Sequence, residues 1–527
     1  MRRALLAPLL GALTIAGPAA AQQHGIDVVS YHFTVTLDTA PGIRVAATVG
    51  FRRGPGAGAR LLLDLVGMTV DSIVNSVTVA RVPFEYDGRR LSIPITSERE
   101  QRVIVTYHGI PGGGLIARAT ARGRPSVFGD NWPERARYWL ASVDHPSDKA
   151  TISWLVENIP RGWRVVANGV CRPVPRRPAV RCVERRPIPT YTMVLGATSF
   201  AVSTHRPVVN GRDTIPIEVW AYPEDSAFAD SVPFRRATLI VETMQRIVGP
   251  YPYEKLAHVQ SSTRFGGMEN ASAIFYAESA YVTRRLGEGT VRHETAHQWF
   301  GDAVTERDWH DLWLSEGFAS YFDGVIGAAL DGDSVLARIM RDNAASYLRS
   351  RVVDRPLVDT TVTDPNDLLN ANSYQKGAWV LHMLRGLVGD SAFFSGVRDY
   401  YRIYRDSTAT SEDFRRVMER AAGGSLDWFF QQWLHQPGYP QLDIRWVNDS
   451  TSRQVVLHVR QAQPAAWGRF RLAVPIRFVG VEGIAWRTLN LDPRYQDQVA
   501  SFTVDRMPAA ILIDPSGTLL LTATVHR

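Results

Sequence analysis

The sequence predicts a multidomain α+β protein with a large N-terminal antiparallel β domain, a mainly helical middle domain and a small C-terminal β-sandwich. Before about residue 203, short runs alternate apolar and polar residues between Gly- and Pro-rich turns, as in an antiparallel sheet. From Phe234 onward, apolar residues recur at helical spacing over about two hundred residues. The break at residues 436–440 ends that pattern, and alternation then returns. A chain of 527 residues is also too long for one ordinary hydrophobic core.

These patterns predict individual elements and domain boundaries. Strands are expected at residues 31–37, 102–107, 151–156, 453–460, 470–478 and 510–513. Helices are expected at residues 234–248, 290–300, 312–329, 334–348, 374–388, 392–404 and 411–422, the last with Ser411 as its capped start. We therefore expect domains at residues 22–204, 205–440 and 441–527.

The first 21 residues have the pattern of a cleavable signal peptide. Arg2 and Arg3 precede an apolar run at residues 4–16, and the alanines at residues 19–21 offer a small-residue cleavage site. A membrane anchor is the alternative, but the run is shorter than the roughly 20 residues that span a bilayer. No later segment predicts a stable membrane anchor. We expect a secreted or periplasmic protein.

Cys171 and Cys182 are the only cysteines, and they flank a turn-rich stretch of Pro and Arg. In an exported protein, a disulfide that closes this hairpin is the favoured interpretation. A metal site is the alternative, but two thiols with no nearby His supply only half of a ligand set.

The charge of the chain does not indicate a nucleic-acid partner. The formal net charge is +7 and the isoelectric point is near 9.4. The arginines are scattered, and no basic block with interleaved aromatic residues occurs. A solvated, mildly basic surface is therefore the favoured interpretation.

The strongest chemical signal is His-Glu-Thr-Ala-His at residues 293–297, within a helical pattern. Helix positions four residues apart share a face, so His293 and His297 can bind one metal ion while Glu294 projects beside it. Glu316 follows on a second helical run and can complete the ligand set. Two His and one Glu leave an open fourth position, which is typical of catalytic zinc. The alternative is a pair of helix histidines with ordinary hydrogen bonds.

A zinc site of this kind activates water. Zn²⁺ lowers the pKa of bound water from about 15.7 to near 7. Glu294 can take that proton and later pass it to the leaving amine. Asp302 and Asp311 are the nearest acids in sequence that could orient the imidazoles. The residues therefore predict metal-assisted hydrolysis with one Zn²⁺ per chain.

A second element, Arg-Phe-Gly-Gly-Met-Glu-Asn at residues 264–270, precedes the metal motif. Paired glycines let another backbone approach an exposed strand closely, although such a segment alone is more often an ordinary loop. Together with the metal motif and Trp-Leu-Ser-Glu-Gly-Phe at residues 313–318, this element resembles the gluzincin family of alanyl and leucyl zinc aminopeptidases, which includes the leukotriene epoxide hydrolase. The resemblance covers residues 25–440, including Tyr-Gln-Lys-Gly at residues 374–377.

The resemblance implies a thermolysin-like catalytic domain and a role for several residues. Glu269 would bind the free α-ammonium of a peptide substrate. Tyr374 would donate to the oxyanion, a placement that lowers a barrier by several kcal/mol. Gly266, Gly267 and Met268 would pair with the substrate backbone.

Two departures from the family pattern affect these expectations. Trp132 stands where the family has an acid or amide that grips the amino terminus, which leaves Glu269, with Asp130 or Asn131 as substitutes. We do not expect a counterpart of the large helical C-terminal domain of longer members, since residues 441–527 are predicted to form only a small sandwich. An open cleft would admit longer peptides, or a homo-oligomer would supply the cover.

Three alternatives to an aminopeptidase remain at this point. A zinc endopeptidase shares the metal chemistry but has no need of an amine-binding Glu269. An epoxide hydrolase has no independent support in the sequence. A non-catalytic peptide-binding scaffold of the same fold would be expected to have lost a ligand, the base or the tyrosine, and all of these are present.

Overall fold

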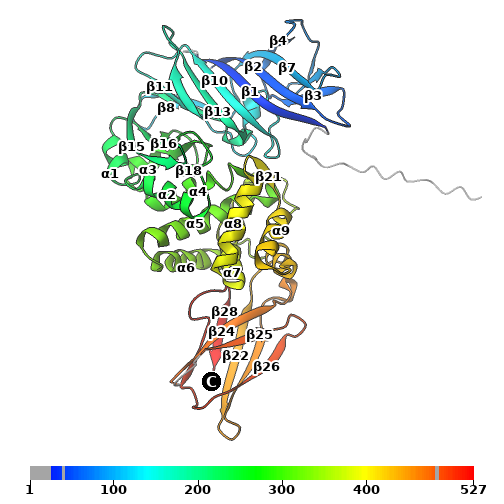
Figure 1. The fold of residues 1–527 in the computed structure, drawn as a ribbon, viewed down its shortest axis with the longest axis vertical. Coiled ribbons are helices and arrows are strands. Elements are labelled where there is room, and N and C mark those ends of the chain that lie inside the picture. Colours follow the sequence, from blue (N-terminus) through cyan, green and yellow to red (C-terminus); the bar gives the residue numbers. More distant parts are fainter. Residues whose placement is uncertain (1–24, 38–41, 481–485) are drawn as a thin grey trace, which may run out of the picture.

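The structure is a computed structural model, and it describes residues 25–37, 42–480 and 486–527. The predicted signal peptide at residues 1–21 lies outside the described residues. The molecule is elongated, with a β-rich part at one end, helices in the middle and further sheets at the other end (Figure 1). This arrangement confirms the predicted fold class.

The N-terminal β domain is built on a seven-stranded sheet. Its strands, in spatial order, are β12 (Val170–Pro173), β13 (Val180–Pro189), β10 (Lys149–Glu157), β1 (Ile26–Leu37), β2 (Ile43–Arg53), β7 (Glu100–Gly109) and β4 (Thr69–Asn75). Alternate residues of β1, such as Phe33 and Val35, are fully buried, as the period-two pattern predicts. Cys171 and Cys182 lie opposite each other on β12 and β13 and form a disulfide.

Two smaller sheets complete this domain. One has the order β11 (Arg164–Ala167), β14 (Leu195–Thr198), β9 (Pro125–Gly129) and β8 (Leu115–Ala119). The other has the order β3 (Arg60–Asp64), β6 (Arg90–Pro94) and β5 (Glu85–Tyr86).

The middle of the chain begins with a five-stranded sheet whose last strand is an edge. The order is β15 (Ala201–Asn210), β16 (Asp213–Ala221), β17 (Leu256–Ser261), β19 (Ala273–Ala277) and β18 (Gly267–Met268). Every residue of β17 and β19 is buried, which fits strands covered on both faces. β18 pairs with β19 alone, so its other side is a free edge. β15 runs across the predicted boundary between residues 204 and 205.

Helices surround this sheet and form the body of the middle region (Figure 1). They are α1 (Ser226–Ser231), α2 (Ala237–Ile247), α3 (Glu278–Val282), α4 (Glu288–His297), α5 (Trp313–Asp331), α6 (Ser334–Leu348), α7 (Gly377–Val388), α8 (Asp390–Tyr404), α9 (Ser411–Ala422) and α10 (Asp427–Phe430). α5 packs against α4, α6 and α7 and is buried over most of its length, so its side chains are held from several sides.

Most helix ends differ from the predicted bounds by a few residues, and three of the differences have a clear local cause. α4 ends at His297 rather than at residue 300, because the chain turns at Gly301. α9 is capped by Thr410 rather than Ser411: the Thr410 hydroxyl accepts from the Asp413 N–H while the Asp413 carboxylate accepts from the Thr410 N–H. α7 begins at Gly377, because Asn372–Lys376 forms a π-helical turn instead.

The C-terminal region consists of two facing sheets. One has the order β26 (Asp497–Thr503), β23 (Gln454–Gln461), β22 (Gln441–Asp449) and β28 (Thr522–His526); the other has β25 (Trp486–Leu491), β24 (Leu472–Val479) and β27 (Ala510–Ile513). A short parallel pair, β20 (Val304–Glu306) and β21 (Ser407–Ala409), lies in the helical region. Across the described ranges, no helix has the length and apolar character needed to cross a membrane.

Candidate metal centre

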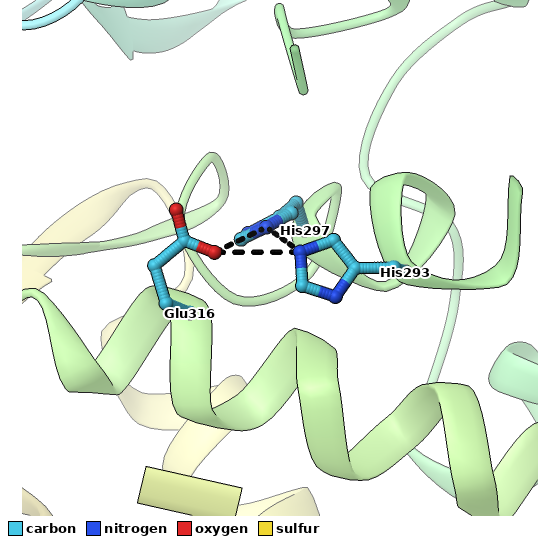
Figure 2. Close-up of side chains that lie close together, drawn as sticks. All are labelled: His293, His297 and Glu316. Carbon is cyan, nitrogen blue, oxygen red and sulfur yellow. Dashed lines mark hydrogen bonds and ion pairs between the residues drawn. The ribbon is translucent and has the colours of Figure 1, made fainter. Parts of the chain in front are cut away.

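Three side chains from α4 and α5 converge on one point (Figure 2). His293 and His297 lie one turn apart on α4, and their Nε2 atoms are 3.1 Å apart. Glu316 lies in the first turn of α5, and its Oε2 is 3.3 Å from each Nε2. The spacing of these residues in the sequence predicts this convergence, and the packing of α5 against α4 produces it.

These three atoms fit a tetrahedral zinc ion. Ligands that bind one such ion at about 2.0–2.1 Å lie about 3.3 Å apart, close to the separations here. Oε2 of Glu316 is buried and has no hydrogen-bond partner among the described residues, so an ion is what would satisfy it. Two imidazoles and one carboxylate leave a fourth position open for water or substrate.

The His297 imidazole is fixed by its second ring nitrogen. Nδ1 lies 3.1 Å from the Phe300 carbonyl oxygen and 3.0 Å from Oγ of Ser315. Since a carbonyl can only accept, Nδ1 carries the proton and Nε2 is free to bind a metal. Gly301, with φ 123°, makes this approach possible, because a Cβ there would lie 2.4 Å from Oγ of Ser315.

Ser315 and the Phe300 carbonyl were not predicted from the sequence, and the predicted alternatives lie elsewhere. Asp302 accepts a hydrogen bond from Gln298, and Asp311 accepts from Ser411, so neither contacts an imidazole. The only signal for Ser315 is that it precedes Glu316 at the start of α5. The closeness of Asp302 and Asp311 in the sequence therefore did not identify the groups that orient the His297 imidazole.

Tyr374 reaches the site from the π-helical turn before α7. Its hydroxyl donates to Oε1 of Glu316 at 2.6 Å, and its ring stacks on His293 with the centroids 6.1 Å apart. Burial, together with Glu316, raises the pKa of Tyr374 well above its usual value. Tyr374 is therefore a neutral hydrogen-bond donor at the edge of the metal centre.

Glu294 lies against Gly267 of β18. A Cβ on Gly267 would be 2.0 Å from Oε1 of Glu294, so only glycine leaves room for this carboxylate. Gly266 is different, because a Cβ there would have no atom within 4 Å. The second glycine of the predicted pair thus accommodates Glu294, and the first borders open space. Burial raises the pKa of Glu294 well above its usual value.

Glu269 directly follows β18 and lies close to Glu294. One ligand atom each of Glu269, Glu294 and His297 lie within 4.8 Å of one another. The Glu269 backbone is held by Gln298, whose Nε2 donates to the Glu269 carbonyl at 2.7 Å. Burial raises the pKa of Glu269, and the nearby His297 opposes this shift. The geometry therefore places a second buried carboxylate beside the metal ligands.

Burial and the neighbouring charges shift the pKa values of Glu316 and His297 in opposite directions. Burial disfavours ionisation of Glu316, but the neighbouring His297 and His293 hold its pKa well below its usual value. Burial also disfavours the charged form of His297, but Glu269 and Glu316 raise its pKa well above its usual value. The carboxyl groups of Glu269, Glu294 and Glu316 thus lie close to His297, and of the three only Glu316 has a lowered pKa.

Trp132 and its neighbours do not offer a further acid or amide to this site. Trp132 is buried, with its ring 5.8 Å from that of Phe265 and 5.6 Å from that of Trp309. The Asp130 carboxylate is paired with Arg135 and Arg264. The Asn131 side chain accepts from Trp139 and donates to the Met193 carbonyl. Asp130 therefore links the β domain to Arg264 of the middle region, and Asn131 is engaged within the β domain.

The comparisons with known proteins agree with this geometry. Residues 235–433 match the Peptidase family M1 domain. The chain is 28% identical over 412 residues to Probable aminopeptidase 2 of Sulfurisphaera tokodaii, an alignment that covers 74% of this chain and 51% of that protein. It is 28% identical over 352 residues to Aminopeptidase N of Streptomyces lividans, with 63% and 40% covered. The chain thus spans about half the length, or less, of these relatives.

Solved structures share the fold. The M1 zinc metallopeptidase from Deinococcus radiodurans superposes with a TM-score of 0.69 at 25% identity, covering 79% of this chain and 95% of that one. Legionella pneumophila aminopeptidase A gives a TM-score of 0.80 at 18% identity, covering 95% of this chain and 60% of that one, and shows the fold alone.

The fold and the His–His–Glu centre are similar to those of the solved M1 zinc metallopeptidase. Residues 235–433 match the domain of the M1 family, which the three sequence motifs resemble, and the ligand set fits Zn²⁺ as the cofactor.

Proposed function

We propose that this chain is an exported zinc aminopeptidase that removes N-terminal residues from peptides. The observation that carries the proposal is the buried Glu269 carboxylate beside Glu294 and His297. A buried carboxylate next to the scissile-bond machinery suits a bound ammonium group, because a charge in such a place needs an opposite charge. A free substrate amino terminus supplies that charge at a fixed distance from the first peptide bond.

In this mechanism His293, His297 and Glu316 hold the zinc ion. The bound ion supplies Lewis-acid chemistry and makes water nucleophilic at neutral pH. Glu294 takes the proton from water and later gives it to the leaving amine. Its position against Gly267 keeps the carboxylate next to the strand that would align the substrate.

β18 would align the substrate as an added strand. Its outer edge is free in the sheet, so Gly267 and Met268 can pair with an extended peptide backbone. Gly266 borders open space and leaves room for that backbone. The first substrate residue would then lie between Glu269 and the metal centre.

Tyr374 would donate its hydroxyl proton to the oxyanion that forms during attack. A tyrosine has one O–H donor, and here it is directed to Oε1 of Glu316. Donation to the substrate therefore requires the hydroxyl to turn away from Glu316. This exchange would make the hydrogen bond available as negative charge develops on the substrate.

Recognition of the amino terminus would depend on Glu269 without a second side chain from the β domain. Trp132 is packed between Phe265 and Trp309, while Asp130 and Asn131 have other partners. The matched Streptomyces lividans and Sulfurisphaera tokodaii proteins are named as aminopeptidases, which supports the same end specificity here.

A pair of peptides tests the proposal. The zinc-loaded protein is expected to hydrolyse a tripeptide with a free amino terminus at least about 100-fold faster than its N-acetylated form, because only the first can pair with Glu269. Glu269→Gln should reduce that ratio, whereas Glu306→Gln, a matched change of another buried acid, should leave it unchanged. Equal rates on both peptides would show an endopeptidase, and no hydrolysis of either would indicate a binding scaffold.

Export is part of the proposal and is supported by the N-terminal sequence pattern and by a disulfide pair. Arg2 and Arg3 followed by an apolar run predict recognition by a secretion system. The Cys171–Cys182 disulfide fits an oxidising compartment. N-terminal sequencing of the periplasmic and culture fractions should find a chain that starts after residue 21; a full-length cytoplasmic chain would contradict export.

A further inference from the structure

A basic groove lies between the N-terminal β domain and the sheet of the middle region. It is a cavity of about 850 Å³, one wall of which is formed by β12 and β13 and the other by residues 210–215 and 250–254. Arg172, Arg181, Arg185, Arg186 and Arg405 line it. None of these residues belongs to the metal centre.

The strand periodicity places the arginines of β12 and β13 on one face. Arg181, Val183 and Arg185 point away from the core, while Cys182 and Glu184 between them are buried. In the pairing of the two strands, Arg172 lies directly opposite Arg181, and Val170 lies opposite Val183. Two guanidinium groups therefore start from neighbouring backbone positions and enter the same cavity.

The charges in this groove are not balanced. Five arginines line it against two carboxylates, Asp213 and Glu254, which leaves an excess of three positive charges. Glu254 pairs with Arg185, and Asp406, outside the lining, pairs with Arg186 and approaches Arg405. Within the described ranges, Arg172 and Arg181 have no carboxylate within 4.0 Å. Besides burial, the charge of Arg181 lowers the pKa of His32 on the nearby strand β1.

The Cys171–Cys182 disulfide holds the two like-charged residues Arg172 and Arg181 next to each other. Like charges directly opposite each other destabilise a strand pair, and the strands would separate more easily at that point. Cys171 and Cys182 form the adjacent cross-strand pair, so their bond holds Arg172 and Arg181 in register. The hairpin thus presents two adjacent guanidinium groups whose charges a ligand, rather than the protein, would neutralise.

We propose that this groove binds a ligand with closely spaced phosphate groups. Guanidinium groups form paired hydrogen bonds with phosphate oxygens, and two adjacent ones can bind neighbouring phosphates. A cleft lined by charges of one sign focuses the electrostatic potential and so attracts a ligand of opposite charge. Pro250, Pro252 and Tyr253 belong to the wall that faces β13. The phosphate groups can belong to a free polyphosphate or to lipid headgroups on a surface.

Inorganic triphosphate and phospholipid vesicles are the probes that test this site. Binding of triphosphate to the full zinc-loaded chain is measured by calorimetry, and binding to vesicles of phosphatidylcholine with phosphatidylglycerol is measured by flotation. Arg172→Ser/Arg181→Ser is compared with Arg445→Ser/Arg477→Ser, a pair of exposed arginines on the C-terminal sheets. Zinc content is measured before and after, because triphosphate also binds divalent ions.

The parent and the control pair are expected to bind, and Arg172→Ser/Arg181→Ser is expected to bind at least about tenfold more weakly. Loss of triphosphate binding identifies a free phosphate ligand, and loss of vesicle binding alone identifies a headgroup. Binding should weaken as salt is raised. Absence of binding to both probes, equal weakening in the control pair, or citrate binding as tightly as triphosphate would overturn the proposal.

The variant is expected to fold, because it removes a like-charge contact on an exposed face. Its melting temperature without ligand should equal or exceed that of the parent. Triphosphate should raise the melting temperature of the parent and of the control pair but not of the variant. If the double variant does not fold, Arg172→Gln alone gives the same comparison.

Discussion

The side-chain amide of Gln298 donates to the Glu269 backbone carbonyl at 2.7 Å and joins the end of α4 to the segment after β18. Its oxygen accepts from the Ser272 N–H and the Tyr251 hydroxyl, and its Nε2 also donates to Asp302. The residue that follows metal ligand His297 thus sets the position of the proposed amine-binding carboxylate. The two halves of the site are held in one hydrogen-bond network.

Gln298→Leu should break the link between the end of α4 and the segment that carries Glu269. Loss of the buried amide removes the partner of the Ser272 N–H and the donor to the Glu269 carbonyl and to Asp302, so the free energy of unfolding should fall by about 3 kcal/mol. A displaced Glu269 should lower kcat/KM about 10- to 100-fold while zinc content stays at one per chain. Kinetics, metal analysis and denaturant unfolding check this. Gln245→Leu, at an exposed amide, is the control; an equal effect of both changes on kcat/KM would contradict the positioning role.

Gly267→Ala should displace Glu294, because the new Cβ would lie 2.0 Å from its Oε1. We expect kcat to fall about 100-fold or more, since a misplaced base cannot transfer the proton, while the zinc ion remains bound. Gly266→Ala has open space and should act mainly on KM. Gly386→Ala, in α7 with no atom near the new Cβ, should leave kinetics unchanged. If Gly267→Ala retained parental kcat, the contact with Glu294 would not matter for the reaction.

Tyr374→Phe removes the hydroxyl that donates a hydrogen bond to Oε1 of Glu316. If that donor moves to the oxyanion, kcat should fall about 10²–10³-fold with little change in KM. Steady-state kinetics on a tripeptide with a free amino terminus measures kcat and KM separately. Tyr401→Phe, which loses a hydrogen bond to the Pro250 carbonyl instead, is the matched change. A rise in KM with unchanged kcat would assign Tyr374 to ground-state binding.

The affinity for zinc should depend on Glu316 and not on other buried acids. Glu316→Gln should lose zinc by about 10-fold or more in affinity, because a neutral amide is a poor ligand. Glu306→Gln is the control: Glu306 is buried, both of its oxygens lack hydrogen-bond partners in the described part of the chain, and burial raises its pKa well above its usual value. Competition with a chromogenic chelator measures both affinities, and chelation should lower the melting temperature of the parent. Equal zinc loss in the two variants would contradict this ligand set.

Lys376 should make stability rise with pH. Burial lowers the pKa of Lys376 to about 7. The Lys376 ammonium donates a hydrogen bond to the Gln436 carbonyl at 3.1 Å. Between pH 7 and the unfolded value near 10.4, the unfolded chain binds more protons, so the free energy of unfolding increases as pH rises through this window. Below pH 7 the full cost of the buried charge is present.

Lys376→Met should reduce that slope, to which the buried Lys149 and Lys255 also contribute because burial lowers their pKa values to about 7 and about 8. The change should stabilise the protein at pH 6 by about 1–4 kcal/mol. Denaturant unfolding at pH 6, 8 and 9.5 measures the effect. Arg341→Met, on the exposed face of α6, should leave the pH dependence of the parent unchanged. A parental slope in Lys376→Met would assign the pH dependence to other groups.

Spacing in the sequence was enough to anticipate how His293, His297 and Glu316 meet, because helix geometry fixes which side chains share a face. It was not enough for Ser315 or Gln298. Both are common polar residues, and their roles depend on the rotation of α5 and on the turn at Gly301. The π-helical turn that carries Tyr374 also has no sequence pattern distinct from an α-helix. Tertiary packing determines the positions of Ser315, Gln298 and Tyr374.

Trp132 illustrates the same limit in the fold. An aromatic residue in this segment predicts burial but not its neighbours, and only the structure places it between Phe265 and Trp309. Likewise Thr410 and Ser411 are both acceptable caps, and the choice between them depends on Asp413 three residues later.

Under the proposed function, the free edge of β18 would make cleavage depend on the conformation of the substrate chain as well as on its sequence. A strand that offers unpaired N–H and C=O groups accepts only a partner that is extended there and has its own amide groups to pair. A proline residue in the paired stretch lacks an N–H, and a helical or compact terminus cannot lie along the strand. Frayed ends and unfolded fragments would thus be processed, while folded proteins of identical terminal sequence would be spared.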